Sequence, residues 1–257
     1  MKTVTDYLSF LFEKKLAYRT ICLHRSVLST TLPHFDGMAI GEHPIVCRLI
    51  KGIFHRRPPR RKMYHSWDVG KVFEVFVAWA PPLSFKQLQR KTAFLVAMAT
   101  SRRPSELASL RCSAAFMSSS NSGLRFLPSA LSKTDRDNHL GPPISVSRLD
   151  SEDKALCPVT SLEDLLSLRQ SLNISHDYIF CQFRPPFKRV SASVFSRRLA
   201  WPLREAGISA PPGSTRSISV SDAFARGVDL KAILSAGDWS GAQTFFRHYL
   251  RPSASCH

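Results

Sequence analysis

Two segments of the sequence carry side chains that suit contact with a phosphate group. The first, TSRRPSELASLR at positions 100–111, places Arg103 directly before a proline of the kind found in the first turn of a helix. The second, near the C-terminal end, contains Arg216, Trp239 and Tyr249. Arginines are planar and permanently charged, and a tyrosine hydroxyl acts as a nucleophile once it is activated. An isolated tyrosine beside two phenylalanines, however, is usually a core aromatic, so none of these residues alone assigns a reaction.

The charge of the chain limits its function more directly. Its 257 residues include 36 lysines and arginines and 19 aspartates and glutamates, which gives a formal net charge of +17. Such an excess predicts an anionic partner. The sequence contains no H-E-x-x-H pair, no Gly-rich phosphate loop and no G-x-S-x-G elbow. We therefore expect neither a metal site nor a nucleotide cofactor.

The cysteines and the apolar stretches indicate the compartment. The six cysteines are widely spaced, with no pair at the short separation of a zinc or redox motif, and they are interpreted as reduced thiols of an intracellular protein. The apolar stretches are far shorter than the roughly 20 residues that cross a bilayer. We expect no membrane segment and no secretory leader.

The elements that must position the candidate residues fall into two domains. Residues 1–54 show helical periodicity and predict a small helical bundle. Residues 66–257 predict a larger helical domain interrupted by a small three-stranded antiparallel sheet between Gly123 and Val146. Short helices, each ended by glycine or begun by a capping residue, follow to the C-terminal end. The predicted fold class is therefore mainly α, in an α+β arrangement.

Residues 55–65, HRRPPRRKMYH, form the boundary between these domains. The Pro58-Pro59 pair favours an extended connector over a helix. Two interpretations of its charge stand: a solvated spacer or nuclear import signal, and a strap that lies on a nucleic-acid backbone. The second agrees with the overall charge. The predicted DNA-binding residues are Arg56, Arg57, Arg60, Arg61 and Lys62.

The two chemical segments resemble the two arginine boxes of tyrosine recombinases, the phage-integrase-like enzymes of DNA strand exchange. The first box is matched at five positions: Arg103, Ser105, Glu106, Leu107 and Leu110. In the second box, Arg216 is the second arginine, Trp239 takes the His or Trp position, and Tyr249 follows ten residues later. The first 65 residues resemble the core-binding domain of this family. The linker and the segment at positions 236–249 are most similar to recombinases of DIRS-like, Ngaro-like and Crypton-like mobile elements.

The resemblance implies a mechanism and a set of roles. Tyr249 would attack a DNA phosphodiester to give a 3′-phosphotyrosyl intermediate, and Arg103 and Arg216 would hold the non-bridging oxygens. Lys133, in the segment LSKTDR where the family keeps a hairpin lysine, would be the general acid. Trp239 would donate a hydrogen bond to the phosphate. The implied partner is double-stranded DNA, on which the family assembles as dimers and tetramers, and the implied location is the nucleus.

One position departs from the family pattern. Gly213 stands three residues before Arg216, where the family has a histidine or a lysine. Loss of an acid–base group typically costs about 10²- to 10⁴-fold in rate, so Gly213 predicts an attenuated enzyme. The alternative is a decayed or domesticated DNA-binding protein that keeps the recombinase clamp. A third hypothesis, an unrelated basic helical protein that binds RNA or acts as a nuclease, lacks the expected exposed aromatics and acidic metal ligands.

Overall fold

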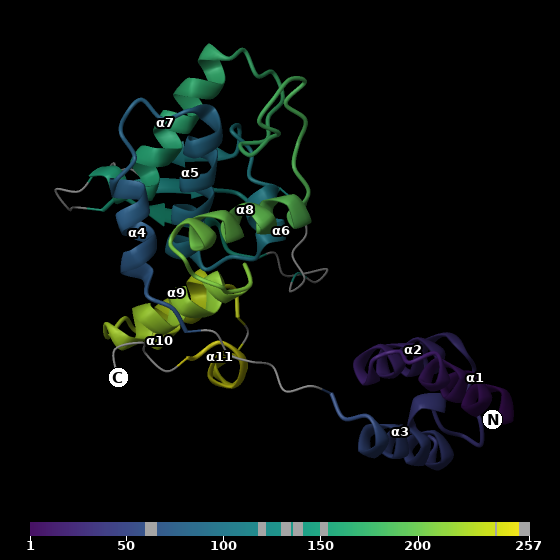
Figure 1. Cartoon of the computed structure of the whole chain (residues 1–257). Coiled ribbons are helices and arrows are strands. Elements are labelled where there is room, and N and C mark those ends of the chain that lie inside the picture. Colours follow the sequence, from purple (N-terminus) through teal and green to yellow (C-terminus); the bar gives the residue numbers. More distant parts are fainter. Residues whose placement is uncertain are drawn as a thin grey trace. The chain divides into compact units, whose positions relative to one another are not determined.

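Helices make up most of the described part of this computed structural model (Figure 1). The structure describes residues 1–59, 66–117, 122–129, 135, 141–149, 154–239 and 241–251. The chain divides into two compact units, residues 1–63 and residues 64–257. The roles assigned to these units from the sequence, DNA core binding and catalysis, stay predictions.

The first unit is built from three α-helices and a short 3₁₀ helix around its own apolar core. Helix α3 begins at Pro44, which lacks the N–H that would have no partner there, and the His43 ring accepts a hydrogen bond from the N–H of Ile45 at 3.3 Å. Leu8, Ile21 and Ile50 are among the buried side chains that the helices share. The elements are α1 (Lys2–Glu13), α2 (Tyr18–Thr31), η1 (Ile40–Glu42) and α3 (Pro44–Arg56).

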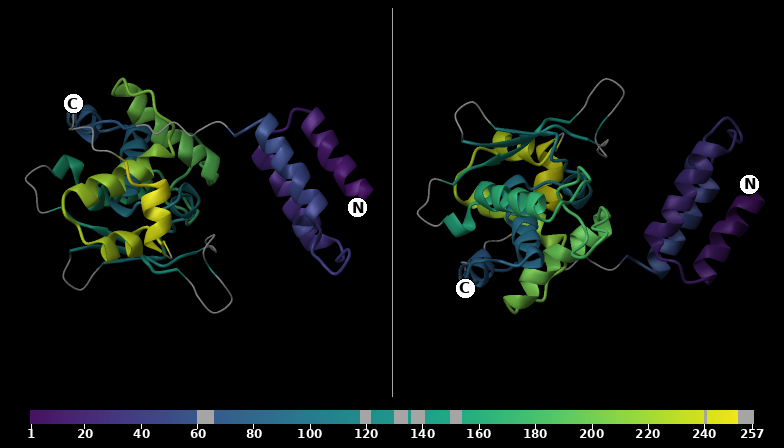
Figure 2. Two further views of the ribbon diagram at one scale, coloured as in Figure 1. Left: turned by 90° about the horizontal axis from the view of Figure 1, so that it is seen from below. Right: turned by 90° about the horizontal axis from the view of Figure 1, so that it is seen from above.

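In the second unit, helix α5 is the central element. It packs against α7, α8, α9 and strand β3, and its buried residues include Phe94 and Leu95 (Figure 2). The predicted capping box is present: Ser84 and Gln87 satisfy each other's backbone N–H groups. The helices of this unit are α4 (Val69–Val77), α5 (Phe85–Thr100), α6 (Pro104–Ala108), η2 (Lys154–Leu156), α7 (Pro158–Ser171), α8 (Ala192–Glu205), α9 (Ser214–Ala225), α10 (Leu230–Ala236) and α11 (Ala242–His248).

The predicted small antiparallel sheet is present, but it begins earlier than expected. Its strands, in the order β1-β2-β3, are β1 (Ala115–Met117), β2 (Gly123–Phe126) and β3 (Ile144–Ser147). Strand β1 lies before the predicted range. The sequence does not predict it, because three residues are too few to show a period of two. Most of the segment LSKTDR, which carries Lys133, lies outside the described residues, and within it only Asp135 is described.

The last three helices share a small apolar core of their own. Val220, Ile233 and Phe245 are buried together, and Trp239 and Tyr249 pack against them. The sequence predicts a helix from Ser217 to Arg226, and α9 begins three residues earlier, at Ser214. Arg216 therefore lies in the first turn of α9.

No helix in the described ranges is long and apolar enough to cross a membrane. The cysteines within the described residues are free thiols: Cys22, Cys47, Cys112, Cys157 and Cys181.

Candidate active site

Arg103 is fixed at the start of α6 by a carboxylate one turn further on. The Glu106 side chain accepts hydrogen bonds from the Arg103 backbone N–H at 3.1 Å and from its Nη1 at 2.7 Å. The preceding Ser101 adopts a left-handed conformation with φ 52° and ends α5, which turns the chain into α6. Glu106 thus serves both as the helix cap and as the counterion that orients the guanidinium.

Arg216 is almost fully buried and contacts the segment that leads to Tyr249. Its Nη2 donates to the carbonyl oxygen of Gly237 at 2.5 Å. Its Cζ lies 4.2 Å from the centre of the Trp239 ring and 5.1 Å from that of Tyr249, both within cation–π distance. Burial lowers the pKa of Arg216 to about 10, and the charges of Arg103 and Arg102 act in the same direction. The two predicted arginines are therefore close enough for the charge of Arg103 to act on Arg216.

Trp239 and Tyr249 form an aromatic pair next to Arg216. Their ring centres lie 4.8 Å apart at an interplanar angle of 61°. Gly237 makes this packing feasible, because a Cβ at that position would come within 1.8 Å of the Trp239 ring. Among the described residues, the buried Trp239 Nε1–H has no hydrogen-bond partner, and the same holds for Nε of Arg216. Buried donors of this kind are normally satisfied, so the site offers donors to an acceptor from outside.

Asp238 links the two arginine segments, and the sequence did not single it out. Its Oδ2 lies 3.6 Å from Nη1 of Arg103 and 3.8 Å from Nη1 of Arg102. Asp238 has a φ of 53°, a left-handed conformation that aspartate tolerates better than most residues. The turn at 237–239 is therefore held by Arg216 on one carbonyl and by Arg102 and Arg103 on one carboxylate.

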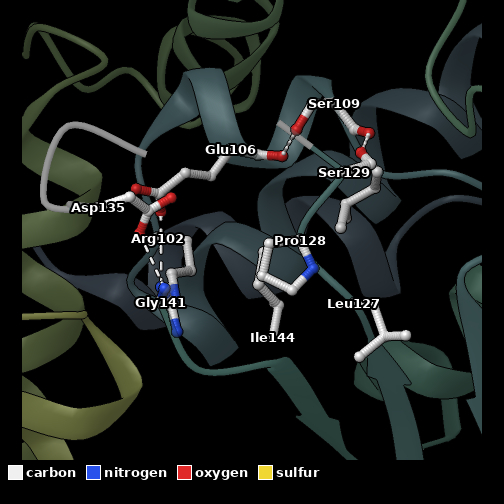
Figure 3. Close-up of a pocket in the computed structure, with 10 residues that line it drawn as sticks. Arg102, Glu106, Ser109, Leu127, Pro128, Ser129, Asp135, Gly141 and Ile144 are labelled. Atoms are coloured by element: carbon white, nitrogen blue, oxygen red, sulfur yellow. Dashed lines mark hydrogen bonds and ion pairs between the residues drawn. The ribbon is translucent and has the colours of Figure 1, made fainter. Parts of the chain in front are cut away.

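A small cavity of about 20 Å³ lies beside Arg102. Figure 3 shows the side chains of Arg102, Glu106 and Asp135 gathered on one side of this cavity. The other side holds Leu127, Pro128 and Ile144 together with Ser109 and Ser129. The carboxylate of Asp135 accepts the N–H of Gly141 at 2.8 Å. Burial lowers the pKa of Arg102, which Glu106, Asp238 and Asp135 partly offset by their negative charge. Arg102 and Asp135, like Asp238, were missed because their contacts join segments far apart in the sequence.

The structure brings together four of the five predicted catalytic residues: Arg103, Arg216, Trp239 and Tyr249. The fifth, Lys133, lies outside the described residues. Tyr249 is the C-terminal cap of α11, half-buried, with its ring against Arg216. A Cβ added at Gly213, the residue before α9, would meet no atom within 4 Å.

The predicted DNA-binding residues of the linker are only partly described. Arg60, Arg61 and Lys62 fall outside the described ranges, and Arg56 is exposed at the end of α3. Arg57 makes internal contacts: it donates to the carbonyl oxygens of Leu16 and Phe12, each at 3.1 Å. Arg57 therefore ties the end of α3 to the end of α1.

No metal centre accompanies this site in the residues that the structure describes. They contain no group of three or more His, Cys, Asp and Glu side chains that could hold a metal ion.

The fold is that of the tyrosine recombinases and integrases. The "Tn1549 transposon integrase in complex with transposon right end DNA" is similar with a TM-score of 0.65 and 13% identity, over 97% of this chain and 80% of that one. XerA recombinase is similar with a TM-score of 0.54 and 17% identity, over 98% of this chain and 86% of that one. A lambda integrase dimer bound to a COC' core site is similar with a TM-score of 0.55 and 15% identity, over 100% of this chain and 81% of that one.

The sequence itself gives no such match. It matches no protein-family model, and a search of the curated proteins finds no similar sequence. The similarity is therefore one of fold, and the function is argued from the site.

Proposed function

We propose that this chain is a tyrosine recombinase that cuts and rejoins double-stranded DNA. The observation that carries the proposal is the convergence of Arg103, Arg216, Trp239 and Tyr249, drawn from α6, α9 and the C-terminal segment. Two arginines and an indole donor beside a phenol suit the transfer of a phosphoryl group to that phenol. The fold that the chain shares with known recombinases and integrases supports the same reaction.

In the proposed reaction, the Tyr249 oxygen attacks the phosphorus of a DNA phosphodiester. A bond from Tyr249 to phosphorus forms, the bond from phosphorus to the 5′ oxygen breaks, and the phenolic proton passes to water. Arg103 and Arg216 hold the non-bridging oxygens, and preorganised donors of this kind contribute roughly 3 to 4 kcal/mol each. Lys133 is the proposed acid that protonates the 5′ oxygen. In the reverse step a 5′ hydroxyl attacks the phosphotyrosine, so bond energy is conserved and no cofactor is required.

The biological setting belongs to the same proposal. The resemblance of the sequence to DIRS-like, Ngaro-like and Crypton-like elements suggests a mobile-element recombinase that acts in the nucleus, with the basic segment 55–65 as strap and import signal. Assembly on DNA is proposed by analogy with structures such as the lambda integrase dimer and the "lambda integrase tetramer bound to a Holliday junction".

Gly213 favours a second candidate function. A protein that keeps the DNA clamp but lacks an acid–base group at this position would bind DNA and cleave it slowly or not at all. The two candidates differ in one product, the covalent protein–DNA adduct.

The first prediction is that nicked suicide duplexes trap this adduct. The substrate is a pool of nicked duplexes with randomised sequence, so that the experiment does not depend on one chosen target sequence. Wild type should form an adduct that resists denaturation, and Tyr249→Phe should form none while it binds the pool with unchanged affinity.

The matched control is Tyr7→Phe, which removes an exposed hydroxyl from the first unit. It should form as much adduct as wild type. An adduct that persists in Tyr249→Phe would refute the nucleophile, and absence of an adduct with intact DNA binding would select the binding-only function.

A further inference from the structure

A second cationic site, apart from the residues assigned above, is centred on Tyr178. The Cζ of Arg189 lies 4.2 Å from the centre of the Tyr178 ring, and that of Arg111 lies 5.1 Å from it. Both arginines also donate to the Tyr178 hydroxyl oxygen, at 3.2 Å from Arg189 Nη1 and 3.4 Å from Arg111 Nη2. Two guanidinium groups therefore converge on a single oxygen atom.

The backbone places these three side chains together. Arg111 and Tyr178 face each other in an antiparallel bridge, reinforced by the hydrogen bond from Cys112 N to the Asp177 carbonyl at 2.7 Å. Arg189 forms a second antiparallel bridge with Cys181. The site is thus built from three extended segments and does not depend on a single flexible side chain.

The two like charges lack an acidic partner. Within the described ranges, neither Arg111 nor Arg189 has a carboxylate within 4 Å. Asp177 is near enough for Arg111 to help lower its pKa, but its oxygens accept from Ser113 N at 2.8 Å and Ser113 Oγ at 2.5 Å, and the Ser113 hydroxyl is the main cause of that shift. Cations held together without a counterion repel each other, and an incoming anion relieves the repulsion.

The loop that carries Arg189 is held in place by packing and hydrogen bonds. Phe183 packs against two guanidinium groups, with Arg198 Cζ at 4.1 Å and Arg90 Cζ at 5.5 Å from its ring centre. The backbone N–H of Phe187 donates to the carbonyl oxygen of Arg184 at 2.9 Å, and that of Gln182 donates to the carbonyl oxygen of Lys188 at 2.8 Å. A site fixed before the ligand arrives loses less conformational entropy on binding.

We propose that Arg111 and Arg189, aligned by Tyr178, bind a backbone phosphate of double-stranded DNA. Arginine forks match phosphate oxygens, and exposed Arg184 and Lys188 on the same loop extend the positive surface. The Tyr178 ring is already covered by guanidinium groups, so it is not a free platform for an unpaired base, which disfavours recognition of single strands. The site would hold the duplex in register while the reaction occurs at Tyr249, so this inference rests on the proposed function.

The test is the salt dependence of binding to a 30-base-pair duplex, measured by fluorescence anisotropy. Each phosphate contact contributes about 0.9 to the log–log slope, so Arg111→Gln with Arg189→Gln should flatten the slope by about 1 and weaken binding. Arg226→Gln with Lys231→Gln removes the same charge from another exposed surface and should leave the slope within about 0.3 of wild type. Arg111→Lys with Arg189→Lys should keep most of the slope, which a purely structural role of the stacked arginines would not predict.

The outcomes separate this inference from the proposed function. An unchanged slope in the glutamine pair, with wild-type adduct formation, overturns the phosphate site and leaves the recombinase proposal standing. Failure of wild type to bind duplex DNA overturns both. A flattening of the slope in the lysine pair as large as in the glutamine pair also overturns the site. The same holds if the glutamine pair loses affinity only for single-stranded RNA or inorganic phosphate, titrated in parallel, and not for the duplex.

Discussion

At the residue scale, the two arginines of the candidate active site are held in different ways. Arg103 has a carboxylate partner in Glu106, whereas Arg216 has a backbone carbonyl and two aromatic rings. Charge on a buried guanidinium without a carboxylate partner is costly, which is why the pKa of Arg216 is lowered. An anion in the site would supply the missing negative charge.

The second prediction follows from this lowered pKa. The folded-state pKa of about 10 lies below the usual arginine value, so the charged form weakens folding at neutral pH, and this penalty falls as the pH rises through 10. A tetrahedral anion should remove the same penalty at pH 7. Sodium phosphate should therefore raise the melting temperature of wild type more than that of Arg216→Gln, measured by differential scanning fluorimetry at constant ionic strength. Equal shifts in both proteins would contradict an anion site at Arg216.

Gly213 gives the third prediction. A side chain placed there meets no atom within 4 Å, so Gly213→His should fold as wild type does. If the missing acid–base group limits the reaction, adduct formation should become about 10²- to 10⁴-fold faster. The measurement is the rate of adduct formation on the nicked pool, with Gly213→Ala as the control for the added side chain. An equal rate in the histidine and alanine variants would show that the reaction does not require this position.

At the scale of elements, the turn between α10 and α11 connects the two arginine segments. Arg216 binds the carbonyl oxygen of Gly237, and Asp238 faces Arg102 and Arg103. This turn orients Trp239, whose ring packs over Gly237 and against Tyr249. The position of Tyr249, the proposed nucleophile, is therefore set by contacts to both arginine segments.

The fourth prediction tests this turn. In Gly237→Ala, the new methyl group would come within 1.8 Å of the Trp239 ring, which must move away from Tyr249. Adduct formation should fall at least 10²-fold while duplex affinity stays within about twofold, because the linker and the Arg111 site are untouched. Gly241→Ala, where a Cβ meets nothing within 4 Å, is the matched control and should keep its activity. Normal adduct formation by Gly237→Ala would show that Trp239 does not position Tyr249.

The elements also show how far the sequence could predict the structure. Local signals were sufficient for α5, because Ser84 and Gln87 form a capping box within one turn. They were insufficient for the start of α9, because Pro211, Pro212 and Gly213 together are typical of a turn, whereas the helix begins at the next residue, Ser214. The contact of Asp238 with Arg102 could not be predicted, because it spans 136 positions and no local pattern records it. The role of Lys133 stays a prediction, since it lies outside the described residues.

At the scale of the whole molecule, the net charge of +17 belongs to two units joined by a basic linker. The linker arginines are not equivalent. Arg57 stacks on Phe12 with its Cζ 4.2 Å from the ring centre and bonds to carbonyl oxygens at the end of α1. Loss of Arg57 is therefore expected to destabilise the first unit, which would complicate any test of the linker that includes it.

The fifth prediction concerns the remaining linker charges. Arg56, Arg60, Arg61 and Lys62 changed together to Ala should flatten the salt dependence of duplex affinity, by up to about 0.9 for each lost phosphate contact. Arg57→Ala should lower the melting temperature of the protein and leave the slope nearly unchanged. Both quantities are measured on the same proteins, by thermal melting and by anisotropy titration. A slope that does not change in the fourfold variant would exclude the linker as a strap on DNA.

The small core of Val220, Ile233 and Phe245, against which Tyr249 packs, has a consequence for how such a protein evolves. In α11 the one fully buried side chain is Phe245, and Tyr249 follows it by a single helical turn. A substitution that shrinks this phenylalanine would loosen the terminal helix while the principal core around α5 stayed intact. Under the proposed function, mutations of this core would silence catalysis, and later mutations would restore it, while the proposed DNA contacts stayed unaltered. A recombinase would become a dedicated binding protein by this route.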